Sequence, residues 1–273
     1  MLFGFRAYGK AIKFIFQHRF YWYLIAPALL MLVIYYLGSL VQHHKFVPDV
    51  KNMNDIVWYL VYLLLEISIA LLLMKFAKYL VVTLLSPLLA HVSQECERIL
   101  TGNTYKWNFQ QLISDIRRAT QIVIRNIMWE YFFFLIILFV SFVGWENPKS
   151  SPIFYLSFGI GFYYYGFSFL DYINERRRLT MDESIIFVRN NRGLAIVIGA
   201  MYSIMILVPV RLEALFNFSG FTHHFWATLG NFLLNLVLWI SASTAPILAI
   251  VAATIGMHDL VDLSKNQYSD KPE

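Results

Sequence analysis

Five long stretches of this 273-residue chain contain no Asp, Glu, Lys or Arg. They are Phe20–His44, Tyr131–Trp145, Ser150–Leu170, Gly193–Val210 and Ala214–His258. A helix needs about 20 predominantly apolar residues to cross the ~30 Å hydrocarbon core of a bilayer. Charged residues make up only 14% of the chain, whereas soluble domains use roughly 25%. The sequence therefore predicts an integral membrane protein.

The basic residues are distributed unequally between the segments that separate the apolar stretches. Of the 22 Lys and Arg residues, 18 fall on one predicted side of the membrane, and only Lys45, Lys51, Lys149 and Arg211 fall on the other. Cytoplasmic loops carry the excess of Lys and Arg. We therefore expect a multi-pass protein with both termini in the cytoplasm, and its basic rim to contact anionic lipids. The basic residues form no separate hydrophilic domain, so nucleic acid is not an expected partner.

The apolar segments predict an all-α fold with about six helical segments. A first span is expected at Phe20–Val41 and a second at Ile56–Met74. Two helical hairpins are expected to follow, Ile127–Trp145 with Ile153–Leu170 and Leu194–Val210 with Trp226–His258, and Pro246 should break the last helix. We expect one helical membrane domain over residues 1–260, with cytoplasmic polar segments at 91–126 and 171–192, and a flexible polar tail at 261–273.

Amphipathic patterns predict further helices outside the spans. In residues 1–17, Arg6, Lys10, Lys13 and Gln17 are spaced as one polar stripe, and apolar residues occupy the rest. Such a helix is typical of the headgroup plane of a membrane. Phe109–Met128 is a second amphipathic candidate. Thr180 with Glu183 matches a capping box and predicts a helix start.

Four segments, taken in order, resemble the CysZ-like, etoposide-induced-protein superfamily. They are YWYLIAPALLMLVI at Tyr21–Ile34, Pro87 followed by Glu97 and ILTG at Ile99–Gly102, LDYINERRRLTMDESIIFVRNNR at Leu170–Arg192, and APILAIVAAT at Ala245–Thr254. The resemblance implies two long spanning helices, hairpins that can enter the bilayer only in part, a homo-oligomer, and sulfate uptake in the inner membrane of bacteria. The family's Gly-Leu-Arg-Arg stretch before the first span, implicated in sulfate binding, is absent. The corresponding place reads Gln17-His18-Arg19-Phe20, where Arg19 is out of register.

Glu66 is the clearest candidate for a functional group, because it lies at the centre of the predicted span Ile56–Met74. An ionised carboxylate there is costly unless it is paired or protonated. One interpretation is a proton site or gate. The other is a neutral acid that hydrogen-bonds a neighbouring helix and stabilises an oligomer.

A second candidate group lies on the last long helix. Asn231 and Asn235 are four residues apart and share a face, and Ser241, Ser243 and Thr244 follow. Hydrogen bonding between helices is the favoured interpretation of such residues. A polar pathway lining is the alternative. The glycines at 159, 161 and 166 are expected to allow close helix packing.

Arg19 and the run Arg176, Arg177 and Arg178 are candidates for contact with an anion or with lipid headgroups. Lipid phosphates are the favoured partners of basic residues beside a span. His43-His44 and His223-His224 could in principle hold a metal. Adjacent loop histidines are usually interfacial, so no metal site and no cofactor are predicted.

Two functions remain open from the sequence. The first is a permease for a small inorganic oxyanion, with sulfate the first candidate and a proton coupled through Glu66. The second is a membrane protein that does not transport but organises lipids or protein partners through its amphipathic helices. The chain has no HExxH, GxxxxGK[ST] or GxSxG motif, so an enzyme is not predicted.

Overall fold

The computed structural model describes residues 2–43, 78–105, 109–145, 150–216, 224–265 and 268, and regular structure throughout these residues is helical. Among them, four helices are long and apolar enough to cross a membrane: Phe20–Ser39, Ile116–Gly144, Pro152–Arg176 and Phe225–Val261. The predicted all-α membrane fold is therefore confirmed, although the number of segments is not fixed. The predicted second span with Glu66 lies outside the described residues.

The N-terminal helix α1 (Leu2–Gln17) contacts α8 (Arg192–Ile206) and α10 (Phe225–Val261). Its buried face includes Tyr8, whose hydroxyl donates to the carbonyl of Ile198 at 3.0 Å. The predicted polar stripe is exposed, and Lys10 pairs with Asp259 at 2.5 Å. Three apolar side chains of α1 are also exposed: Phe5, Ile12 and Phe16. The helix therefore presents one apolar ridge beside one basic stripe.

The chain reaches the first span through a tight turn. Arg19, two residues after the end of α1, has a φ of 59°, in the left-handed region, and the chain turns there. The 3₁₀ turn η1 (Phe20–Leu24) then leads into α2 (Ile25–His43), where Pro27 lies in the first turn and costs no helical hydrogen bond.

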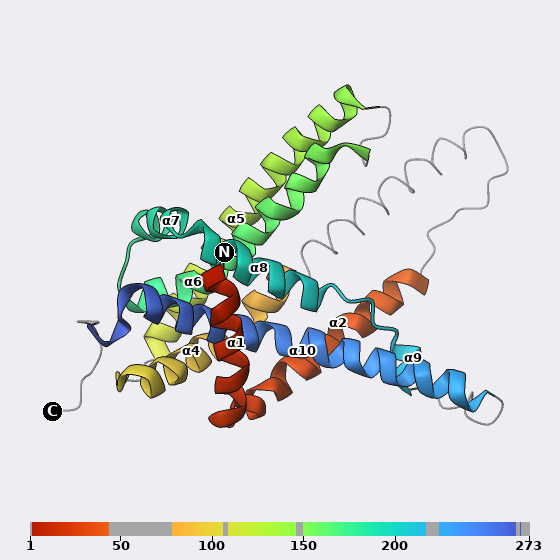
Figure 1. Ribbon diagram of the computed structural model, residues 1–273, viewed down its shortest axis with the longest axis horizontal. Helices are drawn as coiled ribbons and strands as arrows, with labels where there is room; N and C mark the ends of the chain where they lie inside the picture. Colours follow the sequence, from red (N-terminus) through yellow and green to blue (C-terminus); the bar gives the residue numbers. More distant parts are fainter. Residues whose placement is uncertain are drawn as a thin grey trace.

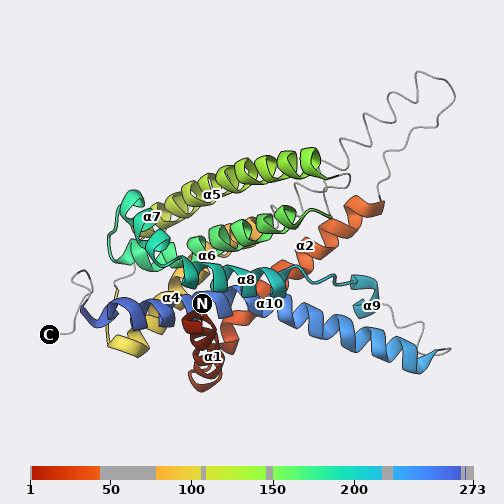
Figure 2. The same ribbon diagram turned by 45° about the horizontal axis from the view of Figure 1, so that its top comes forward.

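The first predicted hairpin is present as α5 (Phe109–Gly144) and α6 (Leu156–Arg176), with η3 (Pro152–Tyr155) before α6. The two helices lie side by side in both views (Figures 1 and 2), and in Figure 1 they project from the other described helices. Toward its tip the hairpin exposes large apolar side chains, among them Phe139 and Phe142. This exposure suits a lipid environment.

α6 and α8 pack closely against each other, and two glycines allow it. A Cβ at Gly166 would overlap the carbonyl oxygen of Ala195, and one at Gly199 would overlap that of Phe162. α6 is joined to α8 by the short helix α7 (Met181–Asn190). The close-packing prediction is confirmed at Gly166, but it is wrong at Gly159, where a Cβ would meet open space.

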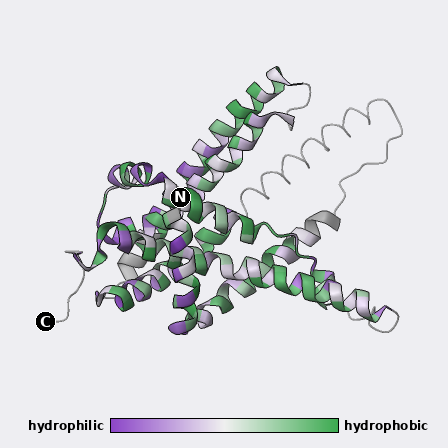
Figure 3. Cartoon of the chain, viewed as in Figure 1, coloured by the Kyte–Doolittle hydropathy of each residue, from purple (hydrophilic) through white to green (hydrophobic). Residues whose placement is uncertain are grey.

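α10 continues through Pro246, so the prediction that this proline breaks the last helix is wrong. Proline is tolerated inside membrane helices because neighbouring helices and hydroxyl side chains compensate for the lost hydrogen bond. Here every residue of Ala245–Met257 is buried, and α1, α4 (Ser86–Thr101) and α8 contact α10. Figure 3 shows that α10 is apolar along most of its length.

The second predicted hairpin has unequal arms. α8 has 15 residues and is about 22 Å long at 1.5 Å per residue, which is shorter than a ~30 Å hydrocarbon core. α10 has 37 residues. Between them lies the short helix α9 (Leu212–Phe216), and after α10 the chain forms η5 (Leu263–Lys265). The first arm is therefore too short to cross a bilayer as one helix.

Candidate functional site

The predicted polar residues of α10 form hydrogen bonds within α10 or to the segment just before α9. The Asn235 side chain accepts a bond from the backbone N–H of Arg211 at 2.7 Å and donates to the carbonyl of Asn231 at 2.8 Å. Asn235 is thus buried and holds the segment that leads into α9, whereas the Asn231 side chain is exposed. This arrangement gives Asn235 a positioning contact between two segments of the chain.

The hydroxyl groups farther along α10 bond backward within the helix. Ser243 donates to the carbonyl of Trp239 at 2.7 Å, and Thr244 donates to the carbonyl of Ser241 at 3.0 Å. Both hydroxyl groups therefore donate to backbone carbonyl groups of α10 itself. They do not join α10 to a neighbouring helix, which was the favoured interpretation of these residues.

The three consecutive arginines have different surroundings. Arg177 donates to the Asn174 side chain at 3.3 Å and lies over the ring of Phe187, 5.0 Å from its centroid. Arg178 is exposed and lies over the ring of Tyr268. Arg176 is buried and bonded to Glu97. The headgroup or anion contact predicted for Arg176 does not fit this position, because its charge faces a carboxylate in the core.

Glu97 and Arg176 form the centre of a buried polar cluster that joins α4, α6 and α10. Arg176 Nε and Nη2 lie 3.0 Å and 2.9 Å from Glu97 Oε2, and Nη2 also donates to Ser93 at 2.8 Å. Ser93 in turn shares a 2.7 Å hydrogen bond with Thr254 of α10. The side chains of Glu97 and Arg176 are 0% and 5% exposed, so each charge depends on the other.

The turn after α4 completes this cluster. Gly102 has a φ of 79° and ends α4 in the left-handed conformation that glycine adopts without strain. The chain then reverses, so that the Asn103 amide donates to Glu97 Oε1 at 3.2 Å and to the carbonyl of Leu263 at 2.8 Å. The Tyr105 hydroxyl also donates to Glu97 Oε1. The resembled motif ILTG therefore ends in a turn that satisfies the buried carboxylate.

A second charged pair lies between α5 and α6. The guanidinium of Arg118 donates to both carboxylate oxygens of Asp171, at 3.0 Å and 2.9 Å, and to the carbonyl of Leu179 at 2.7 Å. Ser184 of α7 donates to Asp171 Oδ1 at 2.5 Å. The bidentate geometry makes this a strong, directional ion pair.

The predicted capping box places Ser184 against Asp171. The Thr180 hydroxyl accepts from the N–H of Glu183 at 3.3 Å, and Glu183 Oε2 accepts from the N–H of Thr180 at 2.8 Å. The Thr180 hydroxyl also donates to Glu183 Oε2 at 2.8 Å, and the two bonds donated by the N–H and the hydroxyl of Thr180 hold the pKa of the Glu183 carboxyl below its ordinary value. The capping box is confirmed, and it fixes where α7 begins.

Glu130 is the functional candidate that the sequence pattern did not identify. It lies on α5 within the membrane-length stretch Ile116–Gly144 and is only 5% exposed. Its Oε2 accepts a hydrogen bond from the Tyr79 hydroxyl at 2.8 Å, and its Oε1 accepts from the Tyr165 hydroxyl at 3.4 Å. Glu130 immediately precedes the charge-free stretch Tyr131–Trp145. The signal that could have identified it is the helical continuity of α5 on both sides of this boundary.

Between the Asp171 pair and Glu130, one further polar contact joins α5 to α6. The Asn126 amide donates to Ser168 at 3.1 Å and to the carbonyl of Tyr164 at 3.2 Å. We refer to Arg118, Asn126, Glu130, Ser168 and Asp171 as the α5–α6 seam. From Arg118 to Glu130 it extends about 18 Å at 1.5 Å per residue. All of its residues except Arg118 are buried.

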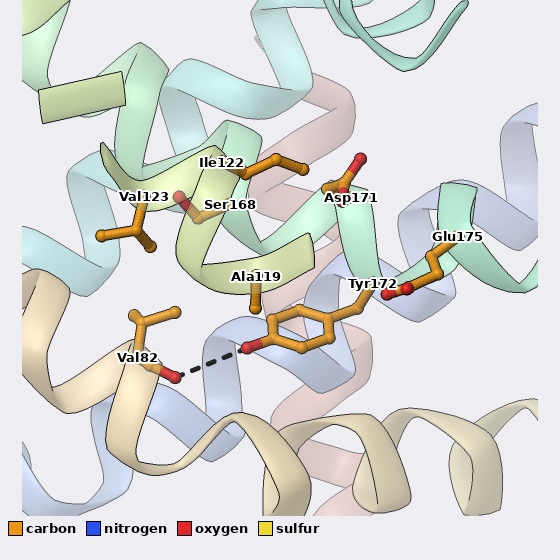
Figure 4. A pocket seen from close by; sticks show the side chains of 8 residues that line it. All are labelled: Val82, Ala119, Ile122, Val123, Ser168, Asp171, Tyr172 and Glu175. Carbon is orange, nitrogen blue, oxygen red and sulfur yellow. Dashed lines mark hydrogen bonds between the residues drawn. The ribbon is translucent and has the colours of Figure 1, made fainter. Parts of the chain in front are cut away.

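A small cavity lies in the seam between α5, α6 and the helical residues 78–84 (Figure 4). Its lining includes Ser168, Asp171 and Glu175, and the Tyr172 hydroxyl donates to the carbonyl of Val82 at 3.4 Å beside it. Its volume of about 10 Å³ is close to the ~10–15 Å³ that one water molecule requires. The cavity therefore offers a polar position for a single water.

No group of three or more potential metal ligands occurs among the residues that the structure describes. His44 and His223 lie outside those residues. The expectation of no metal site therefore stays a prediction.

Four helices of membrane-spanning length and apolar composition, packed on an apolar core that also holds buried ion pairs and the Glu130 carboxyl group, define a multi-pass membrane protein. The sequence matches the family described as sulfate transporter CysZ/etoposide-induced protein 2.4 over residues 7–216. The chain belongs to this family. A comparison with curated proteins finds no match.

Proposed function

We propose that this protein is a permease for a small oxyanion, with sulfate as the first candidate, in the inner membrane of a bacterium. The observation that carries the proposal is the family match over residues 7–216, because the family description names a sulfate transporter. Four membrane-length helices and a polar seam between two of them support it. Transport of a charged solute needs such polar groups within the apolar region.

The unequal distribution of the Lys and Arg residues supports an orientation with both termini in the cytoplasm. Arg19 is exposed at the turn before η1, and Arg178 is exposed after α6. Exposed basic residues raise the local concentration of anions. In this proposal Arg19, Arg177 and Arg178 attract the oxyanion at the cytoplasmic face, while Arg176 stabilises the fold through Glu97.

Uptake of radiolabelled sulfate into proteoliposomes tests the proposal. Purified protein should give sulfate flux above that of empty vesicles, and unlabelled sulfate should compete. Absence of flux above empty vesicles would exclude sulfate, and absence with other small oxyanions would exclude the permease. Glu66→Gln tests the proton coupling proposed for that residue, because unchanged coupling in the variant would remove Glu66 from the mechanism.

A second candidate function is organisation of membrane lipids or protein partners without transport. The specific observation is the surface of α1, where the apolar ridge of Phe5, Ile12 and Phe16 is exposed beside the basic stripe. Such a surface suits an anionic leaflet. Native mass spectrometry with an anionic phospholipid should then show retained lipid, and Lys13→Glu should reduce it. Lys13 is preferable to Lys10 as the test position, because Lys10 also pairs with Asp259.

We also propose that the protein is a homo-oligomer, as the family resemblance implies. The exposed apolar side chains near the tip of the α5–α6 hairpin could contact either lipid or a second copy. Light scattering of the detergent-solubilised protein should give a mass above that of one 32.0 kDa chain after subtraction of the detergent. A monomer mass at all concentrations would contradict this.

A further inference from the structure

Glu130 is placed where a carboxylate has few ways to be stabilised. It projects from α5 within the stretch Ile116–Gly144, at a point that the protein itself buries. Acidic residues in such positions face the bundle interior and mark ion or proton pathways. The seam gives Glu130 polar neighbours on the side of the cytoplasmic segments and apolar α5 residues on the other.

The two tyrosines allow Glu130 to exist in either protonation state. Their hydroxyl groups donate to its two oxygens when the carboxylate is charged. A phenol oxygen is also an acceptor, so after rotation of one hydroxyl it can receive the proton of a neutral carboxylic acid. Neither state then requires a movement of the backbone.

Two further features shape this position. A Cβ at Gly161 would lie 3.0 Å from Glu130 Oε1, so a glycine on α6 leaves the room that the carboxylate occupies. The Lys78 ammonium lies over the Tyr165 ring, 4.2 Å from its centroid. Tyr165 thus contacts a cation with its face and the carboxylate with its hydroxyl. Protonation of Glu130 would change the charge balance beside Lys78.

We propose that Glu130 is a proton-binding site, loaded from the cytoplasmic face through the α5–α6 seam. A proton from the aqueous phase would pass through a water in the cavity beside Ser168 to Glu130, whose carboxylate becomes a carboxylic acid while hydronium becomes water. This assignment deepens the proposed transport function and rests on it for its role, since an oxyanion accompanied by a proton crosses the membrane with less net charge.

Four tyrosines lie close enough to Glu130 to interact with it electrostatically. They are Tyr79 from the helical residues 78–84, Tyr164 and Tyr165 from α6, and Tyr131 from α5. Lys78 is the cation beside Tyr165. Tyrosines and lysines titrate in alkali, with ordinary pKa values of about 10. A carboxylic acid band that forms on acidification can come from any Asp or Glu of the chain, so its loss in Glu130→Gln is what assigns it to Glu130.

Difference infrared spectroscopy of the full chain in lipid nanodiscs, titrated with acid, tests the proton site without requiring transport. We expect a carboxylic acid C=O band that is lost in Glu130→Gln and shifted in frequency in Glu130→Asp. Glu95→Gln is the matched control, because Glu95 pairs with Arg98 at an exposed position on α4, and it should retain the Glu130 band. A band unchanged in both Glu130 variants would overturn the proposal.

Flux measurements then separate the proton site from the permease. If wild-type protein carries sulfate, flux should rise several-fold on acidification, and Glu130→Gln should lose that dependence on pH. If no oxyanion moves but the infrared band depends on Glu130, the proton site stands and the permease falls. If sulfate moves with the same pH dependence in wild type and Glu130→Gln, the coupling proposed here is wrong. Should Glu130→Gln fail to fold, the frequency shift in Glu130→Asp decides alone.

Discussion

Arg176 of α6 and Glu97 of α4 form an ion pair within the protein core, with Arg176 Nη2 2.9 Å from Glu97 Oε2. Desolvation of two charges is compensated only when the pair keeps good geometry and additional hydrogen bonds. Here Ser93, Asn103 and Tyr105 supply those bonds. The pair links α4 to the C-terminal end of α6.

Removal of Arg176 should therefore be strongly destabilising. Arg176→Ala leaves the Glu97 carboxylate buried without its cation, and breaking a buried pair from one side costs about 3–5 kcal/mol. Thermal unfolding in detergent, followed by tryptophan fluorescence, should show a lower midpoint for Arg176→Ala. Arg177→Ala is the matched control, because the Arg177 guanidinium is only partly buried, and its midpoint should fall less. Equal losses in the two variants would contradict the assignment.

The contact of α6 with α8 gives a second prediction. Gly199→Ala should reduce the folded fraction, because its Cβ would overlap the backbone of Phe162 and backbone cannot move as a flexible side chain can. Overpacking of a core costs typically about 1–3 kcal/mol, and we expect the upper end of this range or more. The measurement is the yield of monodisperse protein in size-exclusion chromatography.

Gly159→Ala provides the control on α6, the helix that α8 contacts, since a Cβ there meets no atom within 4 Å. Its yield should match that of wild type. A normal yield for Gly199→Ala would mean that α6 and α8 lie farther apart than the structure places them.

The capping box of α7 predicts a dependence on pH. Because hydrogen bonds from Thr180 lower the pKa of Glu183 below its ordinary 4.5, the charged carboxylate stabilises the helix start. That contribution is present above the ordinary pKa and is lost as pH falls through the lowered one. Hydrogen exchange at the amide of Glu183 should therefore be slow at neutral pH and accelerate relative to its intrinsic rate in acid.

Glu183→Gln is the control for this effect, because glutamine can complete a capping box but does not titrate. Its protection at the residue 183 amide should stay constant across the same acid range. Protection in wild-type protein that does not change with pH would show that the charge of Glu183 contributes nothing to α7.

Patterns within short segments of the sequence were sufficient to predict the features that depend on neighbouring residues. Thr180 and Glu183 are three residues apart, so their spacing alone predicted the cap that the structure contains. The first hairpin followed from two apolar runs separated by a short polar segment. Gly166 was correctly identified as a packing glycine.

Such patterns could not predict contacts between segments that are far apart in the sequence. Arg176 and Glu97 are 79 positions apart, and nothing in either segment indicates that one is the partner of the other. Burial also decided the outcome at Pro246, where surrounding helices keep α10 continuous. Glu130 lies within the predicted arm Ile127–Trp145, but its burial depends on Tyr79 and Tyr165, which are 51 and 35 positions away in the sequence.

The distribution of basic residues predicts which loops face the cytoplasm, and the single cysteine makes this testable. Cys96 is buried in α4, and burial raises the pKa of its thiol, so little reactive thiolate should form. The wild-type chain should therefore give almost no labelling by a membrane-impermeant maleimide, even after lysis. New cysteines can then be added one at a time without removing Cys96.

Asn52→Cys, between the predicted spans Phe20–Val41 and Ile56–Met74, should be labelled from outside intact spheroplasts. Lys265→Cys, on the exposed end of η5, should be labelled only after lysis. The reason is the concentration of 18 of the 22 Lys and Arg residues on one predicted side, which retains those segments in the cytoplasm. Labelling of both cysteines from the same side in intact cells would overturn the orientation. The assignment of a cytoplasmic entrance to the α5–α6 seam would then be lost with it.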